Sequence, residues 1–300
     1  MNINIKDLYT KLETKLLTMR AASLAVGLLA VGTISIAGAY LQQGSRASVV
    51  PVKATNPLPF DMPSASQLDA SPRKVFAHYF TPYPISLDNK DASVDYYQRN
   101  FLTINGESGK HASYGGFLRE RPLPRPVIAS TSWALEDMKM EVRRASQAGL
   151  DGFTVDILGS GDGNQNWERF KILLKAAPLV DPNFKLVLMP DGNGSAAAKG
   201  YESLATNIAS LVKDPTYNKN IYKLSDGRVV VSPFKPETYS ATYWKNFIAS
   251  MKAKGIPVAF VPTFLNYDAQ VDAYSSFSYG FSNWGSRNPR HNNPTYLNSK

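Results

Sequence analysis

Short apolar runs that alternate with stretches of helical period limit this chain to a small set of α/β folds. The runs are rich in β-branched and aromatic residues, as strands are, and the stretches between them repeat an apolar residue every three to four positions. Because strand, helix and strand in this order form parallel pairs with right-handed crossovers, we expect a doubly wound sheet or a barrel. The predicted strands are 75–80, 152–158, 185–190, 228–234, 257–265 and, more weakly, 278–284, and the predicted helices are 135–148, 167–177, 201–212 and 239–254.

The turn after the first predicted strand favours the barrel. A dinucleotide-binding sheet would carry a glycine-rich turn there, whereas this chain has His78 and Pro82. We therefore expect an α/β fold of the (β/α)8 TIM-barrel type. Such a barrel has eight strands in about 250 residues, and only six predicted strands fit between residues 73 and 300. The sequence thus predicts an incomplete barrel, whose unpaired edges would make it fold poorly on its own.

The N-terminal segment has the composition of a membrane helix. Residues 21–41 carry no charged side chain and are mostly apolar, and a spanning helix needs about 20 such residues. Four basic side chains lie within residues 1–20, which predicts a cytoplasmic N-terminus and an exported remainder. Small residues at 37–39 also fit a cleavage site, so a cleaved signal peptide stays open beside an uncleaved anchor. We expect a domain outside the cytoplasm, either membrane-anchored or secreted.

A spacer follows the apolar segment. Residues 42–72 are rich in Pro, Ser and Ala and show neither helical nor strand periodicity. This composition is typical of an extended linker. The predicted domains are therefore a basic segment at 1–20, an anchor or signal at 21–41, a linker at 42–72 and the barrel at 73–300.

Composition argues against several classes of partner. The net charge of +9 comes from scattered lysines and arginines, so we expect no nucleic-acid partner. The chain has no cysteine, which excludes disulfides, thiolate metal sites and cysteine nucleophiles. It has only three histidines, so we expect neither a metal nor a cofactor.

Two aspartates are the best candidates for catalytic groups, because a barrel places its site at the carboxyl ends of the strands. Asp156 lies within an apolar run, where an ionisable group needs a polar cavity or a partner. Asp191 ends the next strand, but it precedes Gly192 and could equally be a turn former. Aromatic faces stack on sugar rings, and carboxyl groups catalyse acid/base chemistry. We predict a sugar site lined by His78, Tyr79, Tyr83, Tyr114, Glu237, Tyr267, Asn283 and Trp284.

The long segment between the first strand and the first helix has a composition of its own. Residues 81–131 are irregular but rich in tyrosine and phenylalanine, too aromatic for a disordered tether. Long loops in compact domains are usually functional or disordered. We expect a cap that forms one wall of the cleft, with plain packing over the barrel's rim as the alternative.

Five segments follow one another in the chain with the spacing of successive barrel strands: Val75–Phe80, Ala148–Phe153, Phe184–Leu186 running to Asp191, Val230–Phe234 and Phe260–Phe264. In this order they resemble the strand signatures of glycoside hydrolase family 71, the endo-alpha-1,3-glucanases or mutanases. The resemblance implies a (β/α) barrel that hydrolyses alpha-1,3-linked glucan with two carboxyl groups, and a sugar site lined by His78, Asp156 and Asp191. The family's tendency to have asparagine at the position of Asp156 favours substrate binding there.

The chain departs from the family in two places. The sixth strand reads Phe281-Ser282-Asn283-Trp284-Gly285 where the family has Trp-Asp-Ala-Trp, and the Asp-Tyr-Gly-Glu motif of a later strand is absent. We therefore expect a bacterial-type, apparently truncated relative with little glucanase activity as it stands. Two hypotheses follow: a glycoside hydrolase acting on an alpha-glucan, or a catalytically inactive, membrane-anchored glycan-binding or envelope protein. A correctly spaced carboxyl pair distinguishes them.

Overall fold

The computed structural model describes residues 67–68, 70–71, 73–115, 120–266 and 271–285. They belong to the second of two compact units, Pro63–Lys300; the first is Met1–Met62. The predicted basic segment, the predicted anchor and most of the predicted linker lie outside the described residues. Among the helices that are described, none combines the length and apolar character that a bilayer crossing requires.

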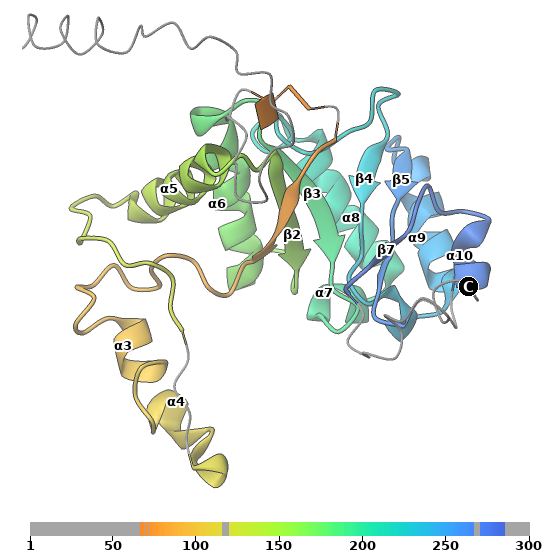
Figure 1. Cartoon of the computed structure of the whole chain (residues 1–300). Coiled ribbons are helices and arrows are strands. Elements are labelled where there is room, and N and C mark those ends of the chain that lie inside the picture. Colours follow the sequence, from red (N-terminus) through yellow and green to blue (C-terminus); the bar gives the residue numbers. More distant parts are fainter. Residues whose placement is uncertain (1–66, 69, 72, 116–119, 267–270, 286–300) are drawn as a thin grey trace, which may run out of the picture. The chain divides into compact units, whose positions relative to one another are not determined.

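The core of the domain is a parallel sheet whose strands follow one another in chain order (Figure 1). A doubly wound sheet reverses its strand order at a switch point, and this sheet does not. The order therefore fits the wall of a barrel, as predicted. Its strands are β1 (Phe76–Phe80), β2 (Gly152–Ile157), β3 (Lys185–Pro190), β4 (Val229–Val231) and β5 (Val258–Phe260).

The last two predicted strands, 257–265 and 278–284, are confirmed, the first of them with one interruption. The predicted strand 257–265 consists of β5 and β6 (Thr263–Phe264), separated by Val261 and Pro262. Proline has no N–H to donate to a ladder, which explains the break. β7 (Ser282–Asn283) pairs parallel with β6 and occupies a sixth position in the row of described strands.

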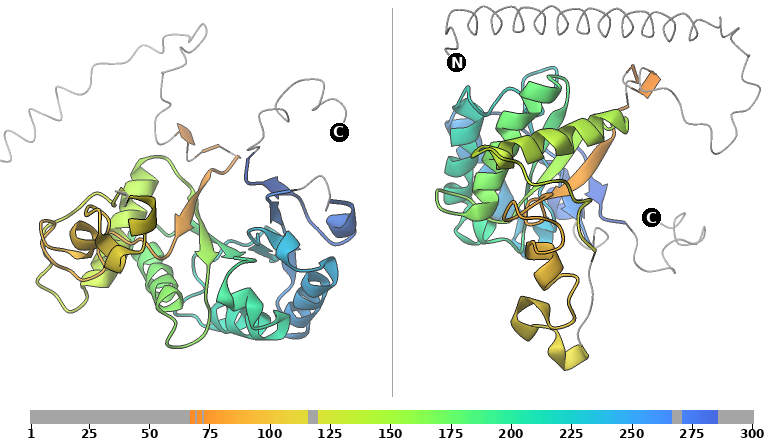
Figure 2. Two further views of the ribbon diagram at one scale, coloured as in Figure 1. Left: turned by 90° about the horizontal axis from the view of Figure 1, so that it is seen from below. Right: turned by 90° about the vertical axis from the view of Figure 1, so that its left-hand side faces the viewer.

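The four predicted helices are confirmed, and they cover one face of the sheet (Figure 2). Polar residues begin two of them: Asn164 accepts hydrogen bonds from the N–H groups of Asn166 and Trp167, and Ser240 accepts one from Tyr243. Their apolar stripes face the sheet and remain buried. The helices are α5 (Trp133–Gln147), α6 (Gln165–Val180), α8 (Tyr201–Lys213) and α9 (Ala241–Ala253), with a short α7 (Ser195–Ala198) after β3.

Side chains alternate between two faces along each strand. Val155, Leu188 and Val231 belong to the large core between sheet and helices, whereas Val187 and Val230 belong to a small inner cluster on the other face. This period of two is the strand periodicity that the sequence predicts. It fixes which polar residues face the helices and which face the interior of the curved sheet.

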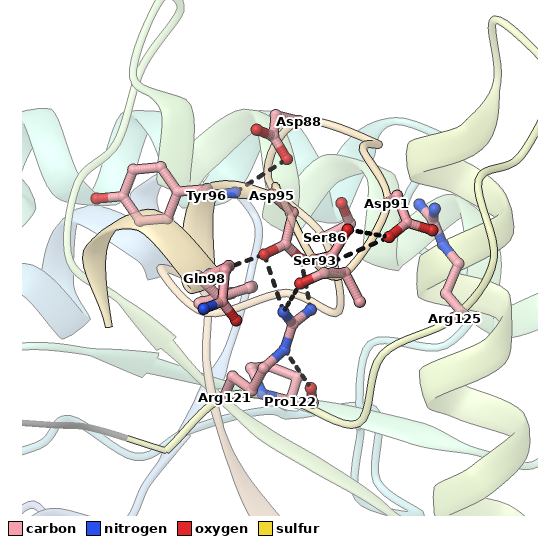
Figure 3. Close-up of polar contacts among 12 residues, drawn as sticks. Ser86, Asp88, Asp91, Ser93, Asp95, Tyr96, Gln98, Arg121, Pro122 and Arg125 are labelled. Atoms are coloured by element: carbon pink, nitrogen blue, oxygen red, sulfur yellow. Dashed lines mark hydrogen bonds and ion pairs between the residues drawn. The ribbon is translucent and has the colours of Figure 1, made fainter. Parts of the chain in front are cut away.

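The long segment after β1 folds into short helices that are tied to the barrel. This segment contains the helices α3 (Tyr96–Asn100) and α4 (Gly106–Gly109) and the 3-10 turn η1 (Ala112–Tyr114). A second 3-10 turn, η2 (Pro236–Thr238), lies elsewhere, after β4. Asp95 caps α3 by accepting the Gln98 N–H at 2.8 Å and forms two contacts with Arg121, at 2.9 and 2.5 Å (Figure 3).

Two further contacts join this segment to α5. Arg125 donates two hydrogen bonds to the buried carboxylate of Asp137, at 2.6 and 2.7 Å. The Ile85 N–H donates to Glu141 at 2.9 Å. The described residues of this segment, called the cap below, are therefore folded and anchored to α5.

Candidate functional site

The interior face of the sheet gathers polar and aromatic side chains at the carboxyl ends of the strands. On β1, His78 shares its face with Phe76 and Phe80, while Tyr79 points to the helices. The same alternation places Asp156 of β2 on the interior face, and Asp191 follows β3 with the same parity. The predicted residues His78, Asp156 and Asp191 are therefore brought together.

Asp156 is almost fully buried, with 2% of its surface exposed. Its Oδ2 lies 3.6 Å from Nε2 of His78, an ion-pair contact longer than a good hydrogen bond. Its Oδ1 is buried and has no hydrogen-bond partner among the described residues. Burial is the main factor that raises the pKa of Asp156, and the charge of Asp191 raises it further, whereas His78 lowers it. An unpaired buried acceptor is costly, and a ligand hydroxyl is the natural donor for it.

Asp191 combines the two roles that the sequence left open. Its Oδ1 accepts the Asn193 N–H at 2.7 Å, which makes it a turn former. The turn packs closely on the next unit, because the Gly192 N–H donates to the Phe234 carbonyl at 2.8 Å. At the same time the carboxyl group is 5% exposed, and burial raises its pKa despite the Asn193 N–H, Lys235 and His78. Asp191 is thus both a turn residue and a member of the cluster.

The strand register sets the separation of the two aspartates. Asp156 pairs with Met189, so Asp191 lies two residues further along the neighbouring strand and faces the same side. A strand spacing of about 4.8 Å and a rise of about 3.3 Å per residue place the two Cα atoms roughly 8 Å apart. Paired carboxyl groups of glycoside hydrolases are about 5 Å apart in retaining enzymes and about 6.5–9.5 Å apart in inverting ones. Side chains from this spacing reach either separation.

Aromatic rings gather around His78, the residue that contacts Asp156. The ring of Trp284, which follows β7, meets His78 edge-on at 4.7 Å between centroids and Phe234 at 4.9 Å. Phe80 lies 6.4 Å from His78, and its side chain is partly open to solvent. Because β1 and β7 are the first and last strands of the row, the Trp284–His78 contact requires a strongly curved sheet. This is the geometry of a barrel wall.

Tyr79 is not part of this cluster, contrary to our prediction. It is 8% exposed and lies in the core, where its ring packs at a tilt against Phe153 at 5.0 Å between centroids, and its hydroxyl contacts the sulfur of Met138 at 3.3 Å. The reason is its parity: it follows His78 by one residue, so it faces α5. Tyr79 therefore stabilises the fold and lies on the opposite face of the sheet from His78 and Asp156.

Three other predicted residues lie around the rim. Tyr83 is 44% exposed and packs on Phe80. Asn283 is exposed on β7. Glu237 in η2 accepts the N–H groups of Leu265 and Asn266 through Oε1, at 2.8 and 3.0 Å, so it orders the chain after β6. Two more predictions lie outside the described part of the structure: Tyr267 and the side chain of Tyr114.

The site residues predicted from the sequence did not include two aromatic members of the cluster, Phe80 and Phe234, or one nearby cation, Lys235. Phe80 shares the face of His78 by alternation, and Phe234 shares the face of Ser232 and Val230 in the same way, so strand parity was the available signal. Lys235 donates to Oδ1 of Asn193 at 3.2 Å, a contact between loops that no sequence pattern indicates. Its φ of 47° places it in the left-handed region, which is uncommon for a residue other than glycine.

Two further features of the molecule concern metal binding and cavities. Within the part of the chain that the structure describes, no group of three or more His, Cys, Asp and Glu side chains is arranged to hold a metal ion. A cavity of about 370 Å³ lies at the opposite ends of the strands, lined by residues such as Lys74, Phe76, Asp151 and Lys185. No predicted site residue lines this cavity.

The fold and the cluster together define a parallel α/β domain of barrel type with buried carboxyl groups and aromatic rings at the carboxyl ends of its strands. No protein-family model and no curated protein matches the chain. The chain is similar to two solved structures of a GH99 endo-alpha-mannosidase from Bacteroides thetaiotaomicron. One has a TM-score of 0.46, 15% identity and coverage of 72% of this chain and 62% of that chain. The other, in complex with bis-tris-propane, has a TM-score of 0.41, 17% identity and coverage of 52% and 48%.

The chain therefore spans between half and two thirds of the length of these structures. The comparisons do not support the resemblance to glycoside hydrolase family 71, because no family model matches. The segments that suggested it are short strand sequences. Such segments are similar among many parallel barrels, since buried strands draw on the same β-branched and aromatic residues.

Proposed function

We propose that this domain binds a glycan at the carboxyl ends of its strands and hydrolyses glycosidic bonds with Asp156 and Asp191 as its two carboxyl groups. The observation that carries the proposal is the pair itself. Two buried carboxyl groups of raised pKa lie at the ends of neighbouring strands, and Asp156 has a buried oxygen without a hydrogen-bond partner among the described residues. Glycoside hydrolysis requires such a pair, one protonated and one ionised.

The surroundings of the two carboxyl groups favour a protonated Asp156 beside an ionised Asp191. Burial raises the pKa of each group, and the charge of Asp191 raises that of Asp156 further. Asp156 is therefore the member of the pair that an ionised Asp191 favours in its protonated form. The protonated member can act as general acid toward the leaving oxygen, and the ionised member as base or nucleophile.

The neighbouring side chains supply the means to bind a sugar. His78 can donate a hydrogen bond to a hydroxyl beside Asp156. Phe80 and Tyr83, which are 37% and 44% exposed, offer ring faces for stacking on pyranose rings. For the substrate we propose an alpha-glucan, with alpha-1,3-glucan as the first polymer to be tested.

The test is an assay of reducing sugar released by the full chain from alpha-1,3-glucan, other alpha-glucans and an alpha-mannan. The mannan is included because the two solved structures are endo-alpha-mannosidases. Asp156→Asn and Asp191→Asn are each expected to reduce the rate about 100-fold or more, as the loss of a general acid or base does. Asp162→Asn is the matched control, since Asp162 lies on the β2–α6 connection with its side chain 99% exposed.

The outcomes separate the two hypotheses. Hydrolysis that depends on both aspartates and not on Asp162 supports the proposal. Retention on one polymer without hydrolysis, reduced by His78→Ala, would identify a glycan-binding protein without catalytic activity and would overturn the hydrolase assignment. Hydrolysis that survives both substitutions would place the reaction elsewhere.

A further inference from the structure

The end of the barrel opposite to the aspartates carries most of the domain's excess positive charge. In a parallel α/β domain the first residues of the strands and the last residues of the helices lie at the same end, which is the upper end in Figure 1. We call this end the basic face and define it by residues 73–76, 144–152, 181–185, 213–229 and 252–258. Its ten basic side chains outnumber its four acidic ones. The basic ones are Arg73, Lys74, Arg144, Lys185, Lys213, Lys219, Lys223, Arg228, Lys252 and Lys254, and the acidic ones are Asp151, Asp181, Asp214 and Asp226.

The opposite end has no such excess. In the last residues of β2 and the connections that follow β2, β3 and β4, it has Lys199 and Lys235 against four acidic side chains. The acidic side chains there are Asp156, Asp162, Asp191 and Glu237. The charge of the barrel is thus polarised along the strand direction, with the candidate glycan site at the end that lacks the positive excess.

Three lysines of the basic face are free to meet an external anion. Lys213 is the last residue of α8, Lys219 and Lys223 lie in the connection between α8 and β4, and all three are exposed. None of them forms an ion pair with a described residue, whereas Lys74 is paired with Asp151 and Arg228 with Asp226. Among the residues that the structure describes, no ion pair therefore neutralises these three charges.

The cavity at this end does not account for the charge. Its lining includes two basic side chains, Lys74 and Lys185, and two acidic ones, Asp151 and Asp181, so its net charge is near zero. The excess comes instead from the surrounding connections. A broad surface of like charge around a neutral hollow suits an extended anionic partner better than one small anion.

The course of the chain indicates which extended partner this is. β1 begins at the basic face, so the chain enters the domain there, and the uncharged apolar segment 21–41 precedes it in the sequence. We propose that the basic face docks on an anionic lipid bilayer. Basic side chains near such a surface are attracted to its acidic headgroups, and the attraction weakens within a Debye length. Docking in this way turns the aspartates and aromatic rings away from the bilayer.

Site-specific fluorescence tests this orientation, and the absence of cysteine makes each label unique. Ser225→Cys places a dye on the basic face between Lys223 and Asp226, and Ala198→Cys places one at the opposite end. The full chain is reconstituted in vesicles of phosphatidylcholine alone or with one third phosphatidylglycerol, both containing a headgroup quencher. We expect quenching at position 225 to be at least about twofold stronger in the anionic vesicles. Salt at about 1 M, where the Debye length is about 3 Å, should abolish the difference.

Charge reversal provides the matched comparison. The triple variant Lys213→Glu, Lys219→Glu, Lys223→Glu should lose the extra quenching at position 225. The control Lys90→Glu, Lys110→Glu, Lys199→Glu changes the net charge equally at exposed sites outside the basic face and should keep it. Circular dichroism verifies that both variants are folded. Equal quenching in the two vesicle types, or an unchanged triple variant, would overturn the proposal, as would tighter binding of the face to duplex DNA than to the anionic vesicles. The inference does not depend on the glycan site.

Discussion

At the scale of single residues, the face of the strand on which a side chain lies determines whether it belongs to the candidate site or to the core. His78 and Tyr79 are neighbours in the sequence, yet His78 contacts Asp156 while Tyr79 is packed against α5. Asp156 was predictable from the sequence, because a carboxyl group inside an apolar run needs a reason to be there. The contact between Trp284 and His78 was not, since it depends on how far the sheet curves between β1 and β7.

The different surroundings of Trp284 and Tyr79 predict different effects when each is replaced by alanine: weaker glycan binding for Trp284 and lower stability for Tyr79. Trp284→Ala should weaken retention on an insoluble alpha-glucan about fivefold or more, because it removes an aromatic contact of about 1 kcal/mol at the site. Tyr79→Ala should instead lower the free energy of unfolding by about 3–5 kcal/mol, as large-to-small core substitutions do. Co-sedimentation with the insoluble polymer and denaturant unfolding measure the two effects. Weakened binding by a stably folded Tyr79→Ala variant would contradict this division.

Glu141 of α5 predicts a pH dependence of the stability of the fold, and its sign follows from the burial of this carboxyl group. Burial raises its pKa to about 7, from an ordinary 4.5, although Tyr79 and the Ile85 N–H partly counteract this. The folded chain therefore keeps a proton that the unfolded chain loses between these values. Stability from this group is fully present below pH 4.5 and is lost as pH rises through 7.

The expected loss between pH 5 and pH 8 is about 3 kcal/mol, and Glu141→Gln should remove it. Glu136→Gln on the same helix is the control, because Glu136 is an exposed partner of Lys139. Denaturant unfolding of each variant at the two pH values measures the difference. An equal slope with pH for wild type and Glu141→Gln would show that this carboxyl group is not responsible.

At the scale of elements, the strands and helices were predictable and the cap was not. Each strand of the barrel wall has a short apolar run and each helix an amphipathic stretch, so local pattern and tertiary packing agree. In the cap, α3 is only five residues long, too short for periodicity to reveal it. A local signal was present in the form of Asp95 followed three residues later by Gln98, which resembles a capping box.

The ion pair between Asp95, which caps α3, and Arg121 predicts what keeps the cap folded. Asp95 is 2% exposed and binds both the helix N-terminus and Arg121, so Arg121→Ala leaves a buried charge without its partner. Removing one partner of a buried pair costs about 3–5 kcal/mol, and we expect the cap to open locally and become sensitive to protease while the barrel stays folded. Arg99→Ala removes an exposed pair with Asp88 and should change little. Limited proteolysis with mass spectrometry locates the cuts, and equal cleavage of the two variants would contradict the expectation.

At the scale of the whole molecule, the two ends of the barrel have different chemistry. One end holds buried carboxyl groups and rings, and the other holds unpaired lysines. Sequence order alone separates these ends, because strand starts and strand ends alternate along the chain. The net charge did not reveal the division, since scattered lysines become a surface only after the strands are aligned in parallel.

The N-terminal segment predicts where this polarised domain works. A reporter enzyme that is active only outside the cytoplasm, fused after residue 72, should be active, because the apolar segment 21–41 follows a basic flank. A fusion after residue 20 lacks that segment and serves as the inactive control. Reporter activity in intact cells is the measurement, and a fusion after residue 72 that stays inactive would place the domain in the cytoplasm.

Glu237 links two consecutive units of the barrel. It lies after β4, but its carboxylate holds the first two backbone N–H groups after β6. Barrel enzymes diversify by exchanging the loops that follow their strands, and each such loop can in principle be inherited as a separate cassette. Here the loops after β4 and β6 share one anchor, because Glu237 of the first holds the start of the second. A recombinant in which the loop after β4 lacks this glutamate would therefore lose the ordered start of the loop after β6. In this lineage the two loops are expected to be inherited together.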